Sequence, residues 1–395
     1  MSEKYLLKGA TVIDGTGNTP VKADVLFEGK EILGVGQVEA GDAQVIDVSG
    51  RYVLPGMINS HIHITFEGDS PDPNGLMARE TNAMTTIRAV RNMQKHLRSG
   101  VTFFRDLGSR DYIDVDLRNA INRGIIDGPE MLVAGKYLTM TGGHGWNIGR
   151  QCDGCDEVMK AAREQLRAGA DVIKIMATGG VLTEGVEPGS PQLTYEEIKV
   201  AVEEAHRAGK KTSTHAQGAT GIMNAVRAGI DSVEHGFYLT EEIIELMLRN
   251  GTYLVPTLIA PYAIYEGGVK AGIPAFIVEK TARVLDDHAA SFRRAYEAGV
   301  KIALGTDSGT PLNRHDMTAF ELKLMVDNGM SEKDAIVSAT SGAAALLGID
   351  EKYGTLEAGK TADMLVLDKN PLENIEAMQN NICTVYKHGK AVLLS

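Results

Sequence analysis

The first candidate site in the sequence is a pair of histidines separated by one residue, His61-Ile62-His63, which ends an apolar run that follows Pro55-Gly56. In a β-strand, side chains two positions apart point to the same side. Both imidazole rings would therefore project together from one strand end. Imidazole is a common ligand of divalent metal ions, so the pair predicts part of a metal site whose other ligands come from elsewhere in the chain.

Four further polar residues lie in or directly after short apolar segments: Lys174, His215, His235 and Asp307. Lys174 stands inside an apolar strand, where an ammonium group is costly to bury unless it is paired or chemically changed. Taken singly, each histidine could be a hydrogen-bonded structural residue, and Asp307 could stabilise a turn. Their shared position at strand ends favours one common site.

A recurrent pattern supplies the strands that would position these residues. A polar, helix-like segment ends in Gly, the usual left-handed helix cap, and a short apolar strand follows. Together with the strand that contains the histidine pair, this gives eight strands, the other seven beginning after Gly100, Gly128, Gly169, Gly209, Gly229, Gly251 and Gly299. Eight such units predict an α/β fold, a (β/α)8 TIM barrel. An open doubly wound sheet is the alternative, but the Gly-rich phosphate motif that typically follows its first strand is absent.

The two ends of the chain differ from this pattern. Residues 1–54 and 358–395 alternate apolar and polar positions with turn signals between them, as half-buried strands do. We therefore expect a small β-sandwich domain built from both termini and a barrel over residues 55–357. Two long loops, 66–75 and 179–192, follow strands and would lie on the catalytic face, either as covers of the site or as plain surface loops.

Composition excludes several classes of protein. The 395 residues carry a formal net charge of −12, which argues against nucleic-acid binding. No apolar run approaches the roughly 20 residues that a membrane helix needs, and no signal peptide is evident. Three cysteines provide no disulfide framework and fit a reducing, cytoplasmic location. The pair Cys152 and Cys155 is a weak metal or redox hint, and two loop thiols are the simpler interpretation.

Metal chemistry accounts for the six strand-end residues together. Barrel enzymes place their sites at the carboxyl ends of the strands, and imidazole with carboxylate suits zinc and similar divalent ions. A protonated lysine is a poor ligand. If Lys174 adds carbon dioxide, it becomes a carbamate whose two oxygens can bridge two metal ions. We therefore expect two divalent ions, zinc or a similar metal, and a carboxylated Lys174.

The pattern of these residues resembles the amidohydrolase superfamily of binuclear metal-dependent hydrolases, and the resemblance covers essentially the whole chain. Thr141-Gly-Gly-His144-Gly, Asp171-Val-Ile-Lys174 and Gly305-Thr-Asp307 look like its prolidase and metal-dependent carboxypeptidase branch, which includes Xaa-Pro dipeptidase-like and imidazolonepropionase-related members. The resemblance implies that His61, His63, Lys174 and Asp307 bind one metal ion and that Lys174, His215 and His235 bind the other.

The resemblance also implies a reaction. Members of this branch hydrolyse dipeptides or N-acylated amino acids, so we expect a dipeptidase or carboxypeptidase that acts on a small molecule with a free carboxylate. A hydroxide shared by the metals would attack the carbonyl carbon, because a metal lowers the pKa of water from 15.7 to about 7. Asp307 would take its proton and deliver it to the departing amine.

Substrate recognition falls to residues near the mouth of the predicted barrel. His144 lies in a Gly-rich loop after the third strand, and Tyr238 follows the sixth strand and could donate its hydroxyl to a carboxylate. We expect both to bind substrate. His96 and His206, near helix ends, and His288 are interpreted as surface residues.

Two alternatives to a peptide hydrolase stay open. One is a cyclic amide hydrolase or a heterocycle deaminase on the same metal site. The other is a catalytically inactive scaffold, although this chain keeps all six expected ligands. The exposed barrel helices leave room for a homo-oligomer, whose presence the sequence does not determine.

Overall fold

The computed structural model describes residues 3–394. The chain divides into two compact units. One contains the residues up to Asn59, Gln94–Phe103 and those from Asp316 onward, and the other contains Ser60–Met93 and Phe104–His315. The domain boundaries near residues 54 and 358 stay a prediction.

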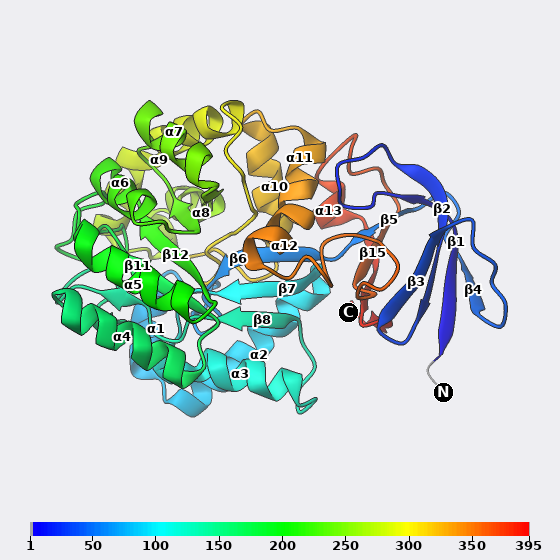
Figure 1. Cartoon of the computed structure of the whole chain (residues 1–395), viewed down its shortest axis with the longest axis horizontal. Coiled ribbons are helices and arrows are strands. Elements are labelled where there is room, and N and C mark those ends of the chain that lie inside the picture. The colour runs from blue at the N-terminus through cyan, green and yellow to red at the C-terminus, as the bar shows by residue number, and fades with distance from the viewer. Residues whose placement is uncertain (1–2, 395) are drawn as a thin grey trace. The chain divides into compact units, whose positions relative to one another are not determined.

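Strands from both ends of the chain form one eight-stranded sheet in the first unit, with the order β17-β16-β15-β5-β1-β2-β3 and β4 paired with β1 (Figure 1). Strand β5 joins the two ends, because it runs parallel to β1 and antiparallel to β15. The strands are β1 (Lys4–Val12), β2 (Val21–Glu28), β3 (Glu31–Gly36), β4 (Gln44–Asp47), β5 (Tyr52–Pro55), β15 (Met364–Leu367), β16 (Ile382–Lys387) and β17 (Lys390–Val392).

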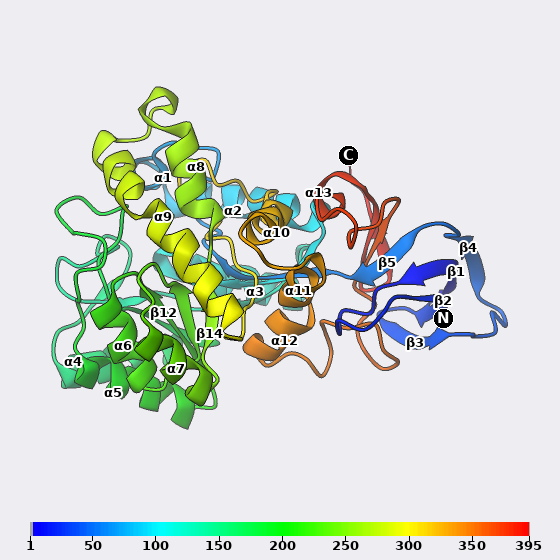
Figure 2. The ribbon, with the colours of Figure 1, turned by 90° about the horizontal axis from the view of Figure 1, so that it is seen from above.

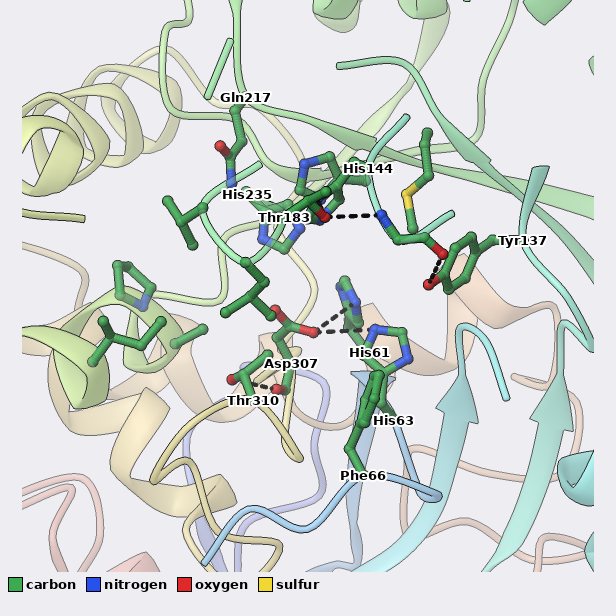
Figure 3. A pocket seen from close by; sticks show the side chains of 18 of the residues that line it. His61, His63, Phe66, Tyr137, His144, Thr183, Gln217, His235, Asp307 and Thr310 are labelled. Carbon is green, nitrogen blue, oxygen red and sulfur yellow. Dashed lines mark hydrogen bonds and ion pairs between the residues drawn. The ribbon is translucent and has the colours of Figure 1, made fainter. Parts of the chain in front are cut away.

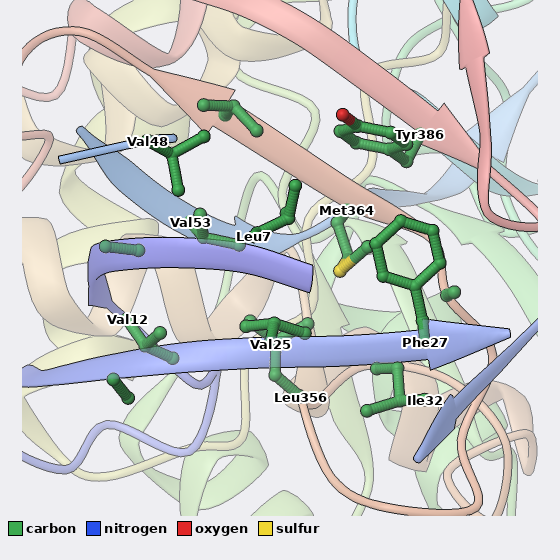
Figure 4. Packing of buried hydrophobic residues seen from close by; sticks show 14 residues of the cluster. Leu7, Val12, Val25, Phe27, Ile32, Val48, Val53, Leu356, Met364 and Tyr386 are labelled. Atoms are coloured by element: carbon green, nitrogen blue, oxygen red, sulfur yellow. The ribbon is translucent and has the colours of Figure 1, made fainter. Parts of the chain in front are cut away.

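This sheet folds over an apolar core. The ring of Phe27 on β2 lies 5.6 Å from that of Tyr386 on β16, although β15, β5 and β1 separate the two strands in the sheet. Fully buried Leu7, Val25 and Ile32 pack into the same core (Figure 4). The sheet is therefore a β-sandwich, and the alternating pattern of the termini reflects one buried and one exposed face.

Parallel strands close into a ring. Leu107 N–H donates to Ile62 O, Ala134 N–H to Asp106 O, and Asp171 N–H to Val133 O. Three further parallel pairings continue the ring from β11 to β14. The ring contains β6 (Met57–Ile62), β7 (Val101–Asp106), β8 (Glu130–Val133), β11 (Val172–Met176), β12 (Lys211–Ala216), β13 (Ser232–His235) and β14 (Tyr253–Val255). The short strand β9 (Leu138–Thr139) pairs with β11, and β10 (Arg150–Gln151) pairs with β9.

The eighth segment of the ring is irregular, where the sequence predicts a strand. It pairs with β14 through Leu254 and Ile302 and with β6 through Ile62 and Ser308. The backbone of Asp307 between these contacts has φ 57°, which interrupts an extended strand. The segment nevertheless closes the ring and confirms the (β/α)8 TIM barrel.

Helices follow the barrel strands, and α4 to α7 flank β12 and β14 (Figure 2). A capping box of Thr194 and Glu197 opens α5, and Gly169 and Gly251 close α4 and α7 in the left-handed conformation. The helices are α1 (Pro73–Arg79), α2 (Asn82–Arg98), α3 (Ile113–Asn122), α4 (Cys155–Ala168), α5 (Tyr195–Arg207), α6 (Ala219–Arg227), α7 (Glu241–Asn250), α8 (Ile259–Gly267), α9 (Ala275–Glu297), α10 (Thr318–Asp327), α11 (Glu332–Ser338), α12 (Ser341–Leu347) and α13 (Ala377–Asn380), with short 3-10 turns at Arg110–Tyr112 and Val269–Ala271. Within residues 3–394, none of these helices has the length and apolar character that crossing a bilayer requires.

Candidate metal centre

A cavity of about 740 Å³, counted to its open mouth, lies at the carboxyl ends of the barrel strands. All six residues predicted as metal ligands line it, as does His144. Figure 3 labels His61, His63, His235 and Asp307 of these, together with His144. The structure thus brings together side chains from five segments of the chain: His61, His63, Lys174, His215, His235 and Asp307.

Two histidines and one carboxylate meet at the base of the cavity. Asp307 Oδ1 lies 3.2 Å from His61 Nε2 and 3.3 Å from His63 Nε2 (Figure 3). One ligand atom from each of the three residues lies within 4.8 Å of the other two. Such a spacing lets the three atoms contact a single ion.

Hydrogen bonds at Nδ1 hold the rings of His61 and His63 so that Nε2 faces Asp307. His61 Nδ1 lies 2.9 Å from Glu234 Oε2, and His63 Nδ1 lies 2.9 Å from the carbonyl oxygen of Gly108. A carboxylate and a carbonyl only accept, so each Nδ1 carries the ring hydrogen and donates. Each Nε2 therefore faces the anionic oxygen, and this contact is favourable when a proton or a metal ion lies between the two atoms.

The electrostatics of Asp307 agree with this arrangement. Burial by itself disfavours the ionised carboxyl, but His61 and His63 outweigh burial and hold the pKa of Asp307 well below its usual value. For His63, burial favours the neutral ring, yet Asp307 outweighs it and raises the pKa of His63. The group therefore attracts positive charge, as a proton or as a metal ion, and its donor set fits a divalent metal.

His215 and His235 form the opposite side of the cluster, with ring centroids 4.6 Å apart. Burial first, and neighbouring groups second, lower the pKa of both rings well below the usual value, so both are neutral. His215 Nε2 donates to Gly179 O at 3.1 Å, and His235 Nδ1 lies 2.7 Å from Thr257 Oγ1. Each ring keeps its second nitrogen for a ligand.

Lys174 has the environment that makes a lysine reactive. Its side chain is 1% exposed, and within residues 3–394 its Nζ has no hydrogen-bond partner. Burial lowers the pKa of Lys174 to about 8, against the opposing attraction of Glu234 and Asp307. A buried amine without a partner in a cavity of metal ligands fits a group that is covalently changed or bound when the site is filled.

A buried ionic network that the sequence analysis missed lies next to His61. Glu234 Oε1 accepts hydrogen bonds from Arg105 Nη2 at 3.0 Å, Ser213 Oγ at 2.8 Å and Ser232 Oγ at 2.6 Å. Burial opposes the charge of Glu234, but Arg105, His61 and Lys174 together outweigh burial and lower the pKa of Glu234 to about 2. The signal was available, because a Glu directly before His235, in a strand predicted to lie inside the barrel, needs a partner for its charge.

Backbone strain marks the same cluster. His235 and Asp307 have φ values of 71° and 57°, and Thr257, the partner of His235, has φ 52°. Non-glycine residues seldom adopt this left-handed region, and they keep it where the surrounding structure compels it, which is common at functional sites.

His144 lies in the cavity wall, as predicted. Its ring lies over Gly180, where a Cβ would come within 2.6 Å of Nε2, so this position requires glycine. Thr183 Oγ1 lies 3.0 Å from His144 Nδ1 and accepts the N–H of Gly145 at 3.1 Å. Lys280 Nζ holds this loop through the carbonyl oxygens of Thr183 and Val186.

Other histidines and Tyr238 lie elsewhere. Tyr238 is not among the residues that line the cavity, and its ring packs against the apolar cluster around Phe237 and Ile264, so its contact with substrate stays a prediction. The surface positions expected for His96 and His288 are wrong. Both are buried, because their helix faces point into the protein, and His288 contacts the carbonyl of Pro256 at 2.7 Å.

Comparison with known proteins agrees with this geometry. The chain matches the Amidohydrolase family over residues 52–392. It is 35% identical to the ochratoxinase of Aspergillus niger, over 86% of this chain and 75% of that protein. A crystal structure of a Xaa-Pro dipeptidase with bound methionine in the active site superposes with a TM-score of 0.89 at 34% identity, over 99% of this chain and 100% of that chain. The imidazolonepropionase of Symbiobacterium thermophilum is 24% identical over 91% of this chain and 85% of that protein.

The chain therefore belongs to the amidohydrolase family. Its members are metal-dependent enzymes, and this protein is a hydrolase of carbon–nitrogen bonds. The resemblance noted in the sequence is confirmed.

Proposed function

We propose that this protein is a binuclear metal-dependent hydrolase that cleaves a small dipeptide or N-acyl amino acid and releases the C-terminal amino acid. His61, His63, carboxylated Lys174 and Asp307 would hold one divalent ion, zinc or a similar metal. Lys174, His215 and His235 would hold the second. The free carboxylate of the substrate is part of the proposal.

One observation carries this proposal: the Nε2 atoms of His61 and His63 converge on the carboxylate of Asp307 beside an amine that has no hydrogen-bond partner in the described chain. Stability alone does not explain such a cluster, because buried polar groups without partners destabilise the folded state. Metal ions would satisfy all of them together.

Carboxylation of Lys174 would complete the ligand set. The neutral Nζ adds to dissolved carbon dioxide, so that an N–C bond forms, one carbon–oxygen π bond breaks and one proton leaves to solvent. The product is a carbamate anion with two oxygens. The depressed pKa of Lys174, about 8, makes its neutral form more abundant at neutral pH than that of an ordinary lysine.

The reaction consumes one water molecule and yields a carboxylic acid and an amine. When bound, divalent ions supply activated water, whose pKa falls from 15.7 to about 7, and they polarise a carbonyl oxygen. Asp307 takes the proton from the attacking water through its carboxylate and passes it to the nitrogen of the departing amine. His144, in the cavity wall, is placed to orient the substrate.

The test is a library assay on the full chain loaded with zinc. Dipeptides, N-acyl amino acids, lactams and purines are incubated with the enzyme, and released amino acid or ammonia is measured beside a chelator-treated control. We expect amino acid release from the first two classes and none after chelation. Metal analysis should find two ions per chain.

Three outcomes would contradict the proposal. Cleavage of lactams or deamination of purines alone would favour the cyclic amide hydrolase or deaminase. Activity that survives complete metal removal would exclude the mechanism. A chain that holds no metal and cleaves nothing would favour the inactive scaffold.

A further inference from the structure

Gln217 is a polar residue of the cavity to which the proposed function assigns no role. It directly follows β12, two positions after His215, so the two side chains project to the same side. It is 3% exposed and lines the cavity, into which it extends (Figure 3). Its backbone is held on both sides: its N–H donates to Thr178 Oγ1 at 2.9 Å, and its carbonyl accepts the N–H of Tyr238 at 3.0 Å.

The oxygen of the Gln217 carboxamide is uncommitted, and a half-turn of the amide group places the donor Nε2 at the same position. Gln217 Oε1 is buried without a hydrogen-bond partner within residues 3–394. A buried amide without a partner is unfavourable, and the fixed backbone prevents the side chain from leaving the cavity. Three other neutral hydrogen-bonding side chains of the cavity are engaged: Tyr137 donates to Gly145 O, Thr310 donates to Asp307 O, and Thr183 contacts His144.

We propose that Gln217 is a specificity residue whose Nε2 donates to the free carboxylate of the substrate, with His144 as the second donor. Thr183 Oγ1 accepts the N–H of Gly145, and its own hydrogen is available to His144 Nδ1, an arrangement that leaves the ring hydrogen of His144 on Nε2. The inference rests on the proposed function.

The charges around the cavity favour this ligand. Among the residues lining it, Lys174 is the one ammonium or guanidinium side chain and Asp307 the one carboxylate, and the proposed function uses both at the metal cluster. A carboxylate elsewhere in the cavity would therefore meet neutral donors and no competing anion. Gln217 and His144 supply such donors.

The wall of the cavity also indicates which amino acid the carboxylate belongs to. It is apolar and comes from α8, from the residue that follows His235-Gly and from the loop 179–192. Such a wall fits an apolar side chain, so the released residue would be an apolar amino acid. The wall residues are Val181, Leu182, Phe237, Ala260, Pro261 and Ile264.

The test compares a carboxylate with its neutral amide on three zinc-loaded full-length proteins: wild type, Gln217→Met and Gln217→Glu. The substrates are N-acetyl-L-methionine and N-acetyl-L-methioninamide, and acetate release gives kcat/KM. Calorimetry measures binding of L-methionine and L-methioninamide in parallel. Gln165→Met is the matched control, because Gln165 is equally buried but its carboxamide is bonded to Ala161 O and the N–H of Lys136.

For Gln217→Met we expect kcat/KM on the acid to fall about tenfold to a hundredfold, the size expected for a lost hydrogen bond to a charged group, with little change on the amide. Gln217→Glu should lower kcat/KM on the acid further, because its carboxylate repels that of the substrate. On the amide, its kcat/KM should equal that of Gln217→Met. Methionine binding should follow the same order. Gln165→Met should keep the ratio of acid to amide.

Equal losses on acid and amide would show that Gln217 is structural and overturn the inference. Tighter binding of either ligand by Gln217→Glu would also overturn it, because the position would then contact a cationic group. If the wild type releases acetate from both substrates with equal kcat/KM, the carboxylate subsite is excluded, but the proposed reaction is supported. If the wild type binds methionine but releases no acetate, the proposed reaction is excluded for this substrate and the subsite is supported. If the wild type does not bind methionine, the subsite is excluded.

Discussion

The core of the β-sandwich and the base of the barrel cavity are buried to the same extent but are built oppositely. Around Phe27 the core contains apolar side chains that fill one another's space (Figure 4). Around Asp307 the cavity contains imidazoles, a carboxylate and an amine that has no hydrogen-bond partner in the described chain (Figure 3). Apolar burial stabilises the fold, whereas buried polar groups oppose it unless they are paired. The contrast separates residues kept for stability from residues kept for chemistry.

The largest effect is expected from Asp307→Asn. The amide can still contact a metal ion but cannot accept the proton of the attacking water. We expect kcat to fall about 10²- to 10⁴-fold, the range for general acid–base groups, with metal content and melting temperature almost unchanged. Steady-state kinetics, metal analysis and thermal unfolding measure the three quantities. An unchanged kcat would rule out the proton-transfer role.

Phe27→Ala should lower stability and leave activity almost unchanged, the reverse of Asp307→Asn. Phe27 is fully buried and stacks on Tyr5 at 5.5 Å and on the edge of Tyr386 at 5.6 Å, so the substitution leaves a cavity. We expect the free energy of unfolding to fall by about 3–5 kcal/mol, while kcat/KM of the folded fraction stays within about twofold, since no residue of the site changes. Denaturant titration and active-site-normalised kinetics test this, with Phe27→Leu as a milder control. A large loss of kcat/KM in the folded protein would show that the core of the β-sandwich also affects the chemistry of the cavity.

Glu234→Gln sharpens the comparison, because Glu234 is a buried charge that does not line the cavity. The amide keeps the shape but loses the charge that faces Arg105, and it no longer forces the ring hydrogen of His61 onto Nδ1. We expect zinc affinity to fall about tenfold to a hundredfold, the usual range for residues that orient a metal ligand. Competition with a zinc chelator measures it. If the melting temperature of the metal-free protein falls while zinc affinity is unchanged, Glu234 acts in folding alone.

Lys280→Met should have the smallest effect. Lys280 holds the loop 179–192 through two carbonyl oxygens of that loop, and the substitution frees the segment that carries Thr183. We expect KM to rise about threefold to tenfold with a smaller change in kcat, since the loop lines the cavity but supplies no ligand. Arg283→Gln is the matched control, because Arg283 bonds the same loop through Glu187 at an exposed site, where ion pairs contribute little. Equal changes in both variants would show that Lys280 has no special role.

Much of this arrangement could be predicted from the sequence, because it depends on local regularities. The two-residue period of a strand put His61 and His63 on one side, and glycines after helices marked where barrel strands begin. The same period, applied after His215, would have indicated Gln217. Helix signals such as Thr194 with Glu197 were equally local, and the structure contains them.

Other features could not be predicted, because periodicity describes one element and not what lies opposite it. The interpretation of His288 as a surface residue was wrong for this reason, and Tyr238 packs beside the cavity wall instead of lining it. The irregular eighth segment belongs here too, since the left-handed backbone of Asp307 is imposed by its neighbours.

The sequence by itself determined which kinds of residues stand at the ends of which strands, and hence the family and the metal-binding chemistry, because strand and helix signals act over a few neighbouring residues. Only the tertiary structure decided which nitrogen of each imidazole carries the hydrogen, that Arg105 and Glu234 support His61, and that Gln217 keeps an unused amide in the cavity. Those properties arise from hydrogen bonds between residues as far apart as Arg105 and Glu234, and such partners meet only when the barrel closes.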